Sequence, residues 1–111
     1  MDTSGFSEGS FSGRSISRAQ VVMPCRLSWA GVDASAIIRD LSPAGLGLSL
    51  SETTPLKMKE KVHLHLRDRI TLQVVPVHAH HEPGRLVAGF KVATIEKGRE
   101  EWNSLVAKVE R

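Results

Sequence analysis

The sequence predicts an all-β-dominated fold, a small antiparallel barrel or sandwich followed by one C-terminal α-helix. Six segments with strand-like apolar patterning fall within about seventy residues, and short turns separate most of them. After these segments the apolar spacing changes from that of a strand to that of a helix. A length of 111 residues fits a single domain with one core.

The composition narrows the class of protein. The formal net charge is +3 and the pI about 9.4, which suits an anionic partner but is too weakly basic to indicate a dedicated nucleic-acid binder. The single cysteine, Cys25, excludes a disulfide framework and is expected to be an inert core thiol. No apolar run approaches the ~18 residues of a membrane span, and no signal-peptide pattern opens the chain. We therefore expect a cytoplasmic protein without a membrane span.

The first half of the chain begins with a polar arm and continues into three strands. Residues 1–13, with four Ser and three Gly, are predicted to be disordered, although Phe6 and Phe11 are either incidental or ready to dock. The predicted barrel covers residues 21–93. Its first three strands are Val21–Trp29, with Pro24 indicating an edge or a bulge, then Ala34–Leu41 after a turn at Ala30–Asp33, and Leu46–Leu50.

The second half contains the clearest hairpin. Val62–Leu66 and Ile70–Val74 alternate strictly, and a three-residue loop, Arg67–Arg69, pairs apolar with apolar positions, whereas a two-residue loop would not. The alternation breaks at Val75–Val77, which predicts a bulge. After a turn at His81–Gly84 the last predicted strand is Leu86–Ala93. A helix is predicted over residues 97–109 from the spacing of Trp102, Leu105, Val106 and Val109.

Two short motifs carry the functional signal. Asp40, Ser42 and Gly45 form D-x-S-x-x-G, which on its own also fits a simple loop whose Asp and Ser stabilise turns and whose Gly is free to adopt positive φ. Upstream, Arg14 and Arg18 form R-x-x-x-R. Guanidinium groups match phosphate and the O6/N7 edge of guanine, and a carboxylate accepts from the N–H groups on guanine's other edge. Together these residue types suit a guanine nucleotide.

In this order and spacing, the two motifs resemble the signature of the PilZ domain family, bacterial receptors for cyclic di-GMP. The resemblance covers essentially the chain after residue 13 and extends to the Gly89–Phe90 pair. It implies a six-stranded antiparallel split barrel with a C-terminal helix over residues 14–111, preceded within the domain by a ligand-binding arm at residues 14–20. The resemblance implies that Arg14 and Arg18 bind phosphate and guanine, that Asp40 and Ser42 contact guanine, and that Gly45 permits the turn.

The resemblance further implies a non-catalytic receptor that needs no cofactor. On ligand binding, the arm would fold over the dinucleotide and create a surface for an unidentified protein partner in motility, exopolysaccharide or pilus regulation. Gly13 stands where many members have another basic residue, so one ligand per chain is expected. The chain is expected to be a monomer or a weak homodimer.

Other functions fit the sequence less well. His63 and His65, or His78 and His80, have a spacing that suits a metal site, but few further ligands accompany them. No catalytic motif is present, so no enzyme activity is predicted. A small barrel that binds RNA or DNA would need exposed aromatic side chains, and Trp29 is the one candidate on the strands. A PilZ-like protein–protein adaptor remains a further alternative.

Overall fold

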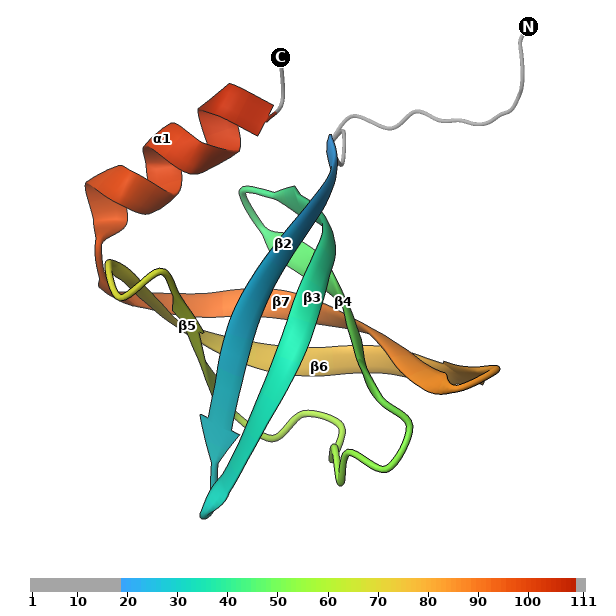
Figure 1. The fold of residues 1–111 in the computed structure, drawn as a ribbon. Helices are drawn as coiled ribbons and strands as arrows, with labels where there is room; N and C mark the ends of the chain where they lie inside the picture. Colours follow the sequence, from blue (N-terminus) through green and yellow to red (C-terminus); the bar gives the residue numbers. More distant parts are fainter. Residues whose placement is uncertain (1–18, 110–111) are drawn as a thin grey trace, which may run out of the picture.

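The structure, a computed structural model, describes residues 19–109. They form a closed antiparallel barrel with the strand order β2–β3–β4–β7–β6–β5, and one helix lies at one end of it (Figure 1). The predicted barrel with a C-terminal helix is therefore confirmed, and the sandwich alternative is wrong. The elements are β2 (Ala19–Trp29), β3 (Val32–Ser42), β4 (Gly45–Ser51), β5 (Val62–Leu66), β6 (Ile70–Glu82), β7 (Arg85–Lys97) and α1 (Arg99–Val109).

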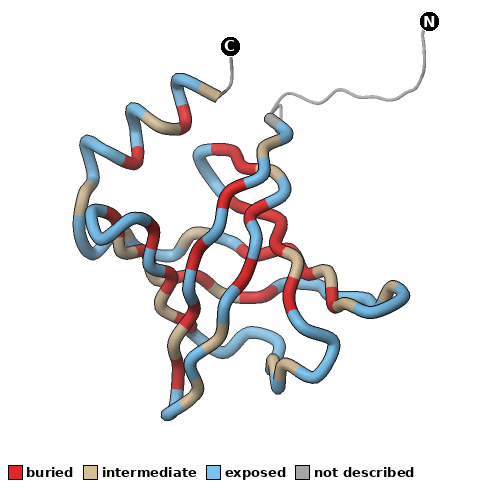
Figure 2. The backbone as a smooth tube through the Cα atoms, in the orientation of Figure 1, coloured by how far each residue is buried: buried red, intermediate tan, exposed pale blue. Residues whose placement is uncertain are grey.

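The core fills the barrel with one face of each strand. Buried and exposed residues alternate along the strands, as Figure 2 shows, because successive side chains of a strand point to opposite faces. The residues with no exposed surface, or almost none, come from all six strands and from the helix. They include Leu27, Ile38, Leu41, Leu46, Leu48, Leu64, Leu72, Phe90 and Trp102.

The barrel closes through a short contact between its first and fourth strands. β2 pairs with β5 only from Arg26 to Ser28, so the edge of β2 before Arg26 has no β5 partner. Pro24, which cannot donate a main-chain hydrogen bond, lies on this part of β2. The register of β2 also shifts between Gln20 and Met23. Pro24 predicted an edge or a bulge, and both lie nearby.

The central hairpin has the predicted register. Leu66 pairs with Ile70 and Leu64 with Leu72, across the three-residue loop. The predicted bulge is confirmed as well, because the register between β6 and β7 shifts between Pro76 and His78. Pro76 is buried, whereas the next two residues are both exposed.

Several elements are longer than predicted. β2 begins at Ala19, so the last two residues of the predicted arm at 14–20 belong to the barrel. The predicted turn at Ala30–Asp33 is confined to Ala30 and Gly31, and β3 extends through Ser42. β6 and β7 continue as a paired ribbon to Glu82 and from Arg85. These extensions consist mostly of polar residues and are held by main-chain pairing, so alternation of apolar residues could not predict them.

The helix covers one end of the core. Trp102 and Val106 are buried, and Leu105 and Val109 are partly buried against the same core, as their spacing predicted. α1 begins at Arg99, directly after Gly98. Gly98 has a positive φ of 78°, which favours glycine, and a Cβ at this position would clash with the Arg69 carbonyl oxygen. Within residues 19–109, no helix is long and apolar enough to cross a membrane.

The turn between β2 and β3 contains an unfavourable backbone conformation. Ala30 has a φ of 45° and Gly31 a φ of 80°, the left-handed pair that a two-residue hairpin requires. Because a Cβ disfavours this region by about 1 kcal/mol, we expect Ala30→Gly to raise the free energy of unfolding by up to that amount. Urea unfolding measures the change. Ala44→Gly, in the Pro43–Ala44 turn without positive φ, is the control and should not stabilise the fold.

The cysteine should resist alkylation. Cys25 is buried, and this burial raises the pKa of its thiol to about 12. At pH 8 the native protein should therefore remain unmodified by iodoacetamide over the time in which the urea-unfolded chain reacts completely, because the thiolate is the nucleophile. Mass spectrometry measures the modification. Rapid alkylation of the native chain would contradict this assignment.

Candidate functional site

The candidate site is created by extra residues in two adjacent strands. Asp40 of β3 pairs with Gln20 of β2 and with Gly47 of β4, and Ile38 pairs with Met23 and with Leu48. In β4 the two partners, Gly47 and Leu48, are adjacent, so this strand has no residue between the two pairs. At the same place β3 has one extra residue, Arg39, and β2 has two, Val21 and Val22. The strands therefore bulge next to each other at one place on the barrel wall.

The bulge turns two charged residues to the same side. Ile38 and Leu41 have no exposed surface, whereas Arg39 is exposed and Asp40 is partly exposed. In a regular strand, Arg39 and Asp40 would point to opposite faces. The pattern Ile-Ile-Arg-Asp-Leu, with two apolar residues followed by two charged ones, is the sequence signal that could have revealed this bulge.

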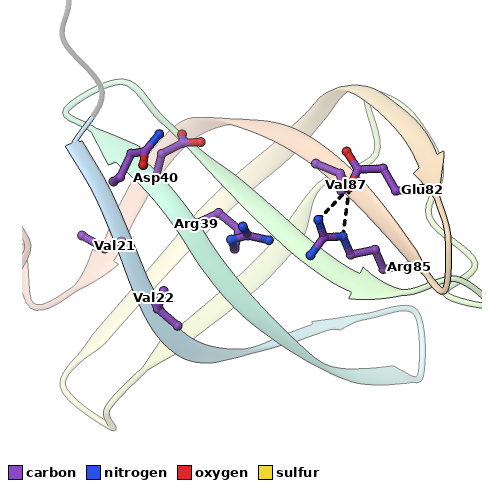
Figure 3. Close-up of a pocket in the computed structure, with 8 residues that line it drawn as sticks. Val21, Val22, Arg39, Asp40, Glu82, Arg85 and Val87 are labelled. Carbon is purple, nitrogen blue, oxygen red and sulfur yellow. Dashed lines mark hydrogen bonds and ion pairs between the residues drawn. The ribbon is translucent and has the colours of Figure 1, made fainter.

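The two residues line a groove on the outside of the barrel. It has a volume of about 430 Å³ and extends from the bulge to the β6–β7 hairpin (Figure 3). The far wall is formed by Glu82, Arg85 and Val87, which no sequence motif indicated because they belong to a distant hairpin. Its full lining is Gln20, Val21, Val22, Arg39, Asp40, Glu82, Arg85 and Val87.

Beside the groove, Asp40 lies over a glycine. A Cβ on Gly47 would be 2.6 Å from Asp40 Oδ2, so only glycine leaves room for this carboxylate position. Gly47 pairs with Gly89, and the His78 ring occupies the place where a Gly89 Cβ would lie. The neighbouring strands β4 and β7 therefore have no side chain at Gly47 and Gly89, and Asp40 and His78 occupy the space that a Cβ would need there. Glycines inside strand patterns are the sequence signal for such close approach.

The other two residues of the D-x-S-x-x-G motif, Ser42 and Gly45, flank the turn between β3 and β4. Ser42 is buried, with 2% of its surface exposed, and its hydroxyl donates to the Gly45 carbonyl 3.4 Å away across the Pro43–Ala44 turn. Gly45 begins β4 and is not among the described glycines with positive φ. The turn therefore does not use the positive φ that glycine allows at this position. The alternative explanation of Ser42 as a turn-stabilising hydroxyl fits its contact.

The far wall of the groove is an ion-paired cluster. The Arg85 guanidinium donates from Nε and Nη2 to Glu82 Oε1, at 3.0 and 2.7 Å, as Figure 3 shows. His80 Nε2 lies 3.0 Å from the other oxygen, Oε2. The hydrogen bonds from Arg85, and secondly from His80, hold the pKa of Glu82 below its usual value. Glu82 therefore stays ionised at neutral pH.

The other candidate residues are distributed as follows. Arg14, Arg18, Phe6 and Phe11 lie outside the described residues, so their predicted roles stay predictions. Of the histidines, His63 forms a contact of 2.8 Å with Glu96 and His65 one of 3.0 Å with Ser28. In residues 19–109, no three His, Cys, Asp or Glu side chains are grouped to hold a metal ion.

Comparisons with known proteins agree with this architecture. The family model of the PilZ domain matches residues 13–108. A solved structure of the Bacillus subtilis inhibitor of motility, MotI/DgrA, superposes with a TM-score of 0.71 over 88% of this chain, at 15% sequence identity. The match covers 49% of that chain, so this chain spans about half of its length. No curated protein matches the sequence.

Proposed function

This chain belongs to the PilZ domain family, and we propose that it is a non-catalytic receptor for cyclic di-GMP, whose site includes Arg14, Arg18, Asp40, Ser42 and Gly45. The observation that carries the proposal is the position of the motif carboxylate. Asp40 lies on the outer wall, beside a groove lined by two guanidinium groups, on the strand that pairs with the first residues of β2. One carboxylate and two guanidinium groups thus line the same groove, where a guanine nucleotide can contact both kinds of group.

The chain connectivity leaves the motif arginines within reach of this groove. Gln20 pairs with Asp40, and Arg18 precedes Gln20 by two residues. Two residues of extended chain span at most about 7 Å, and the six residues from Arg14 to Gln20 span about 20 Å. Both arginines are therefore within reach of a ligand that contacts Asp40. In the proposed complex they bind phosphate and guanine, while Asp40 accepts hydrogen bonds from the N1 and N2 groups of guanine.

The geometry refines the roles of the remaining motif residues. Ser42 is proposed to act mainly by holding the turn to Gly45, because its hydroxyl is buried there. Gly47, which lies just after the D-x-S-x-x-G motif, leaves room for the Asp40 carboxylate. A single ligand per chain is proposed, since Gly13 offers no further cation before Arg14.

The proposed output is a protein contact. Once residues 14–18 cover the ligand, arm, ligand and barrel wall form a surface that the free chain lacks, which a partner can bind. The structural similarity to an inhibitor of motility supports motility control as the first process to test, ahead of exopolysaccharide or pilus regulation. We propose a cytoplasmic location, where a cyclic dinucleotide messenger acts.

A nucleic-acid polymer is a poorer ligand for this barrel. Within the described part of the chain the three aromatic residues, Trp29, Phe90 and Trp102, are all buried. The predicted stacking candidate, Trp29, therefore cannot offer its ring to a base. Single-stranded nucleic-acid binding depends on such stacking.

The proposal is tested by calorimetry with cyclic di-GMP. We expect saturable binding by the unmodified chain, and a loss of affinity of about tenfold to a hundredfold in Arg18→Ala and Asp40→Ala, because charged hydrogen bonds contribute about 1.5–3 kcal/mol each. Asp33→Ala, which removes an exposed carboxylate elsewhere on β3, is the control and should bind normally. Binding that follows any polyanion and falls steeply with salt would instead support a nucleic-acid function.

A glycine substitution tests the position of Asp40 without removing its charge. Gly47→Ala places a methyl group against the Asp40 carboxylate and should weaken cyclic di-GMP binding by about tenfold, if one charged hydrogen bond is lost. The matched substitution Gly89→Ala displaces His78 instead and should weaken binding less. Equal effects of the two substitutions would argue against a special role of the Asp40 position. Thermal melts of both variants control for folding.

A further inference from the structure

We infer that the barrel wall has an anion subsite in which Arg39 and Arg85 bind a phosphate group, and that Glu82 competes with this phosphate for Arg85. The inference rests on the proposed function, because the phosphate is the phosphodiester of cyclic di-GMP that faces the barrel. A cyclic dinucleotide carries two phosphodiesters on opposite sides of its ring. In the proposed complex the R-x-x-x-R motif contacts one of these sides, so the phosphodiester on the other side needs cations from the barrel.

Arg39 provides the first cation. The bulge places it on the outer face next to Asp40, where its side chain is exposed. Its side chain forms no hydrogen bond or ion pair with another residue in the described range 19–109. All five N–H donors of its guanidinium are therefore available to a ligand in the groove that it lines.

Arg85 provides the second cation, from the opposite wall. Its Nε and Nη2 donate to one oxygen of Glu82, which leaves its other N–H groups for a second acceptor. The side chain is 42% exposed, so a solute can reach it. Val87, two residues further along β7, provides an apolar contact in the same groove.

The Glu82 carboxylate already binds the Arg85 guanidinium, the group proposed to bind the phosphate. Its carboxylate accepts from Arg85 as a phosphate oxygen would, and His80 holds the other oxygen. An entering phosphate would meet the negative charge of Glu82 and compete for the same donors. Removing that charge while keeping the shape of the side chain should therefore strengthen binding of an anionic ligand.

Calorimetry with cyclic di-GMP tests both parts of the inference. We expect Arg39→Ala and Arg85→Ala each to weaken binding about tenfold, the loss of one charge-assisted hydrogen bond of about 1.4 kcal/mol, and Arg85→Lys to weaken it less. Glu82→Gln should strengthen binding about threefold, a gain in the range of an exposed charge interaction. In Glu82→Gln/Arg85→Ala this gain should disappear. Unchanged melting temperatures control for folding.

The chain offers a matched control pair. Arg26 and Asp33 form an exposed ion pair of 2.8 Å elsewhere on the barrel and do not line the groove. Arg26→Ala and Asp33→Asn change the net charge by the same amounts as Arg85→Ala and Glu82→Gln, and should leave the affinity unchanged. If Asp33→Asn strengthens binding as much as Glu82→Gln, affinity follows net charge and the competition is refuted.

The failure of this inference can be told apart from failure of the receptor proposal. Normal binding by Arg39→Ala and Arg85→Ala, together with loss of binding in Asp40→Ala, would overturn the subsite and leave the receptor function in place. Absence of binding by the unmodified chain would overturn both. Weakened binding in both arginine variants, with tighter binding only in Glu82→Gln, would support the subsite.

Discussion

The candidate site depends on the spacing of two core residues in β3. Ile38 and Leu41 are three positions apart, yet both are completely buried. Since residues three apart in a regular strand face opposite sides, the core can hold both only if the strand contains a bulge between them. The bulge in turn exposes Arg39 and Asp40 together. Burial of two apolar side chains, each contributing about 2 kcal/mol, thus holds the two charges at the surface.

The same reasoning explains which parts of the fold could be predicted from the sequence. The register of the β5–β6 hairpin could be predicted because one face is apolar, and a shift by one residue would expose Leu64 and Leu72. The β6 bulge left a visible break in the alternation. The ends of strands could not be predicted, because the ribbon from His78 to Glu82 is held by main-chain pairing and is mostly exposed.

The residues that line the candidate groove could be predicted only in part, for a related reason. A linear motif contains only residues that are close in sequence, so it led to Asp40 and Ser42. It did not lead to Arg85, which reaches the groove through the pairing of β7 with β4. The chemical type of Ser42 suggested a ligand contact, whereas its burial and its bond to Gly45 could be known only from the folded turn. Gly47 carried a readable signal, a glycine in a strand, without indicating which side chain approaches it.

The charges of the groove explain why a receptor of this kind would need its arm. Arg39 and Arg85 are balanced by Asp40 and Glu82, so the formal charges lining the described groove cancel. A neutral, open groove on the surface binds a dianion weakly, because water and salt screen each contact. In the proposed complex the excess positive charge comes from Arg14 and Arg18, and ordering the arm costs several kcal/mol. In this proposal, ligand binding and folding of the arm depend on each other, because neither the barrel nor the arm alone would hold the ligand. A surface built from both exists only while the ligand is bound, which is the property that a partner protein needs in order to detect the messenger.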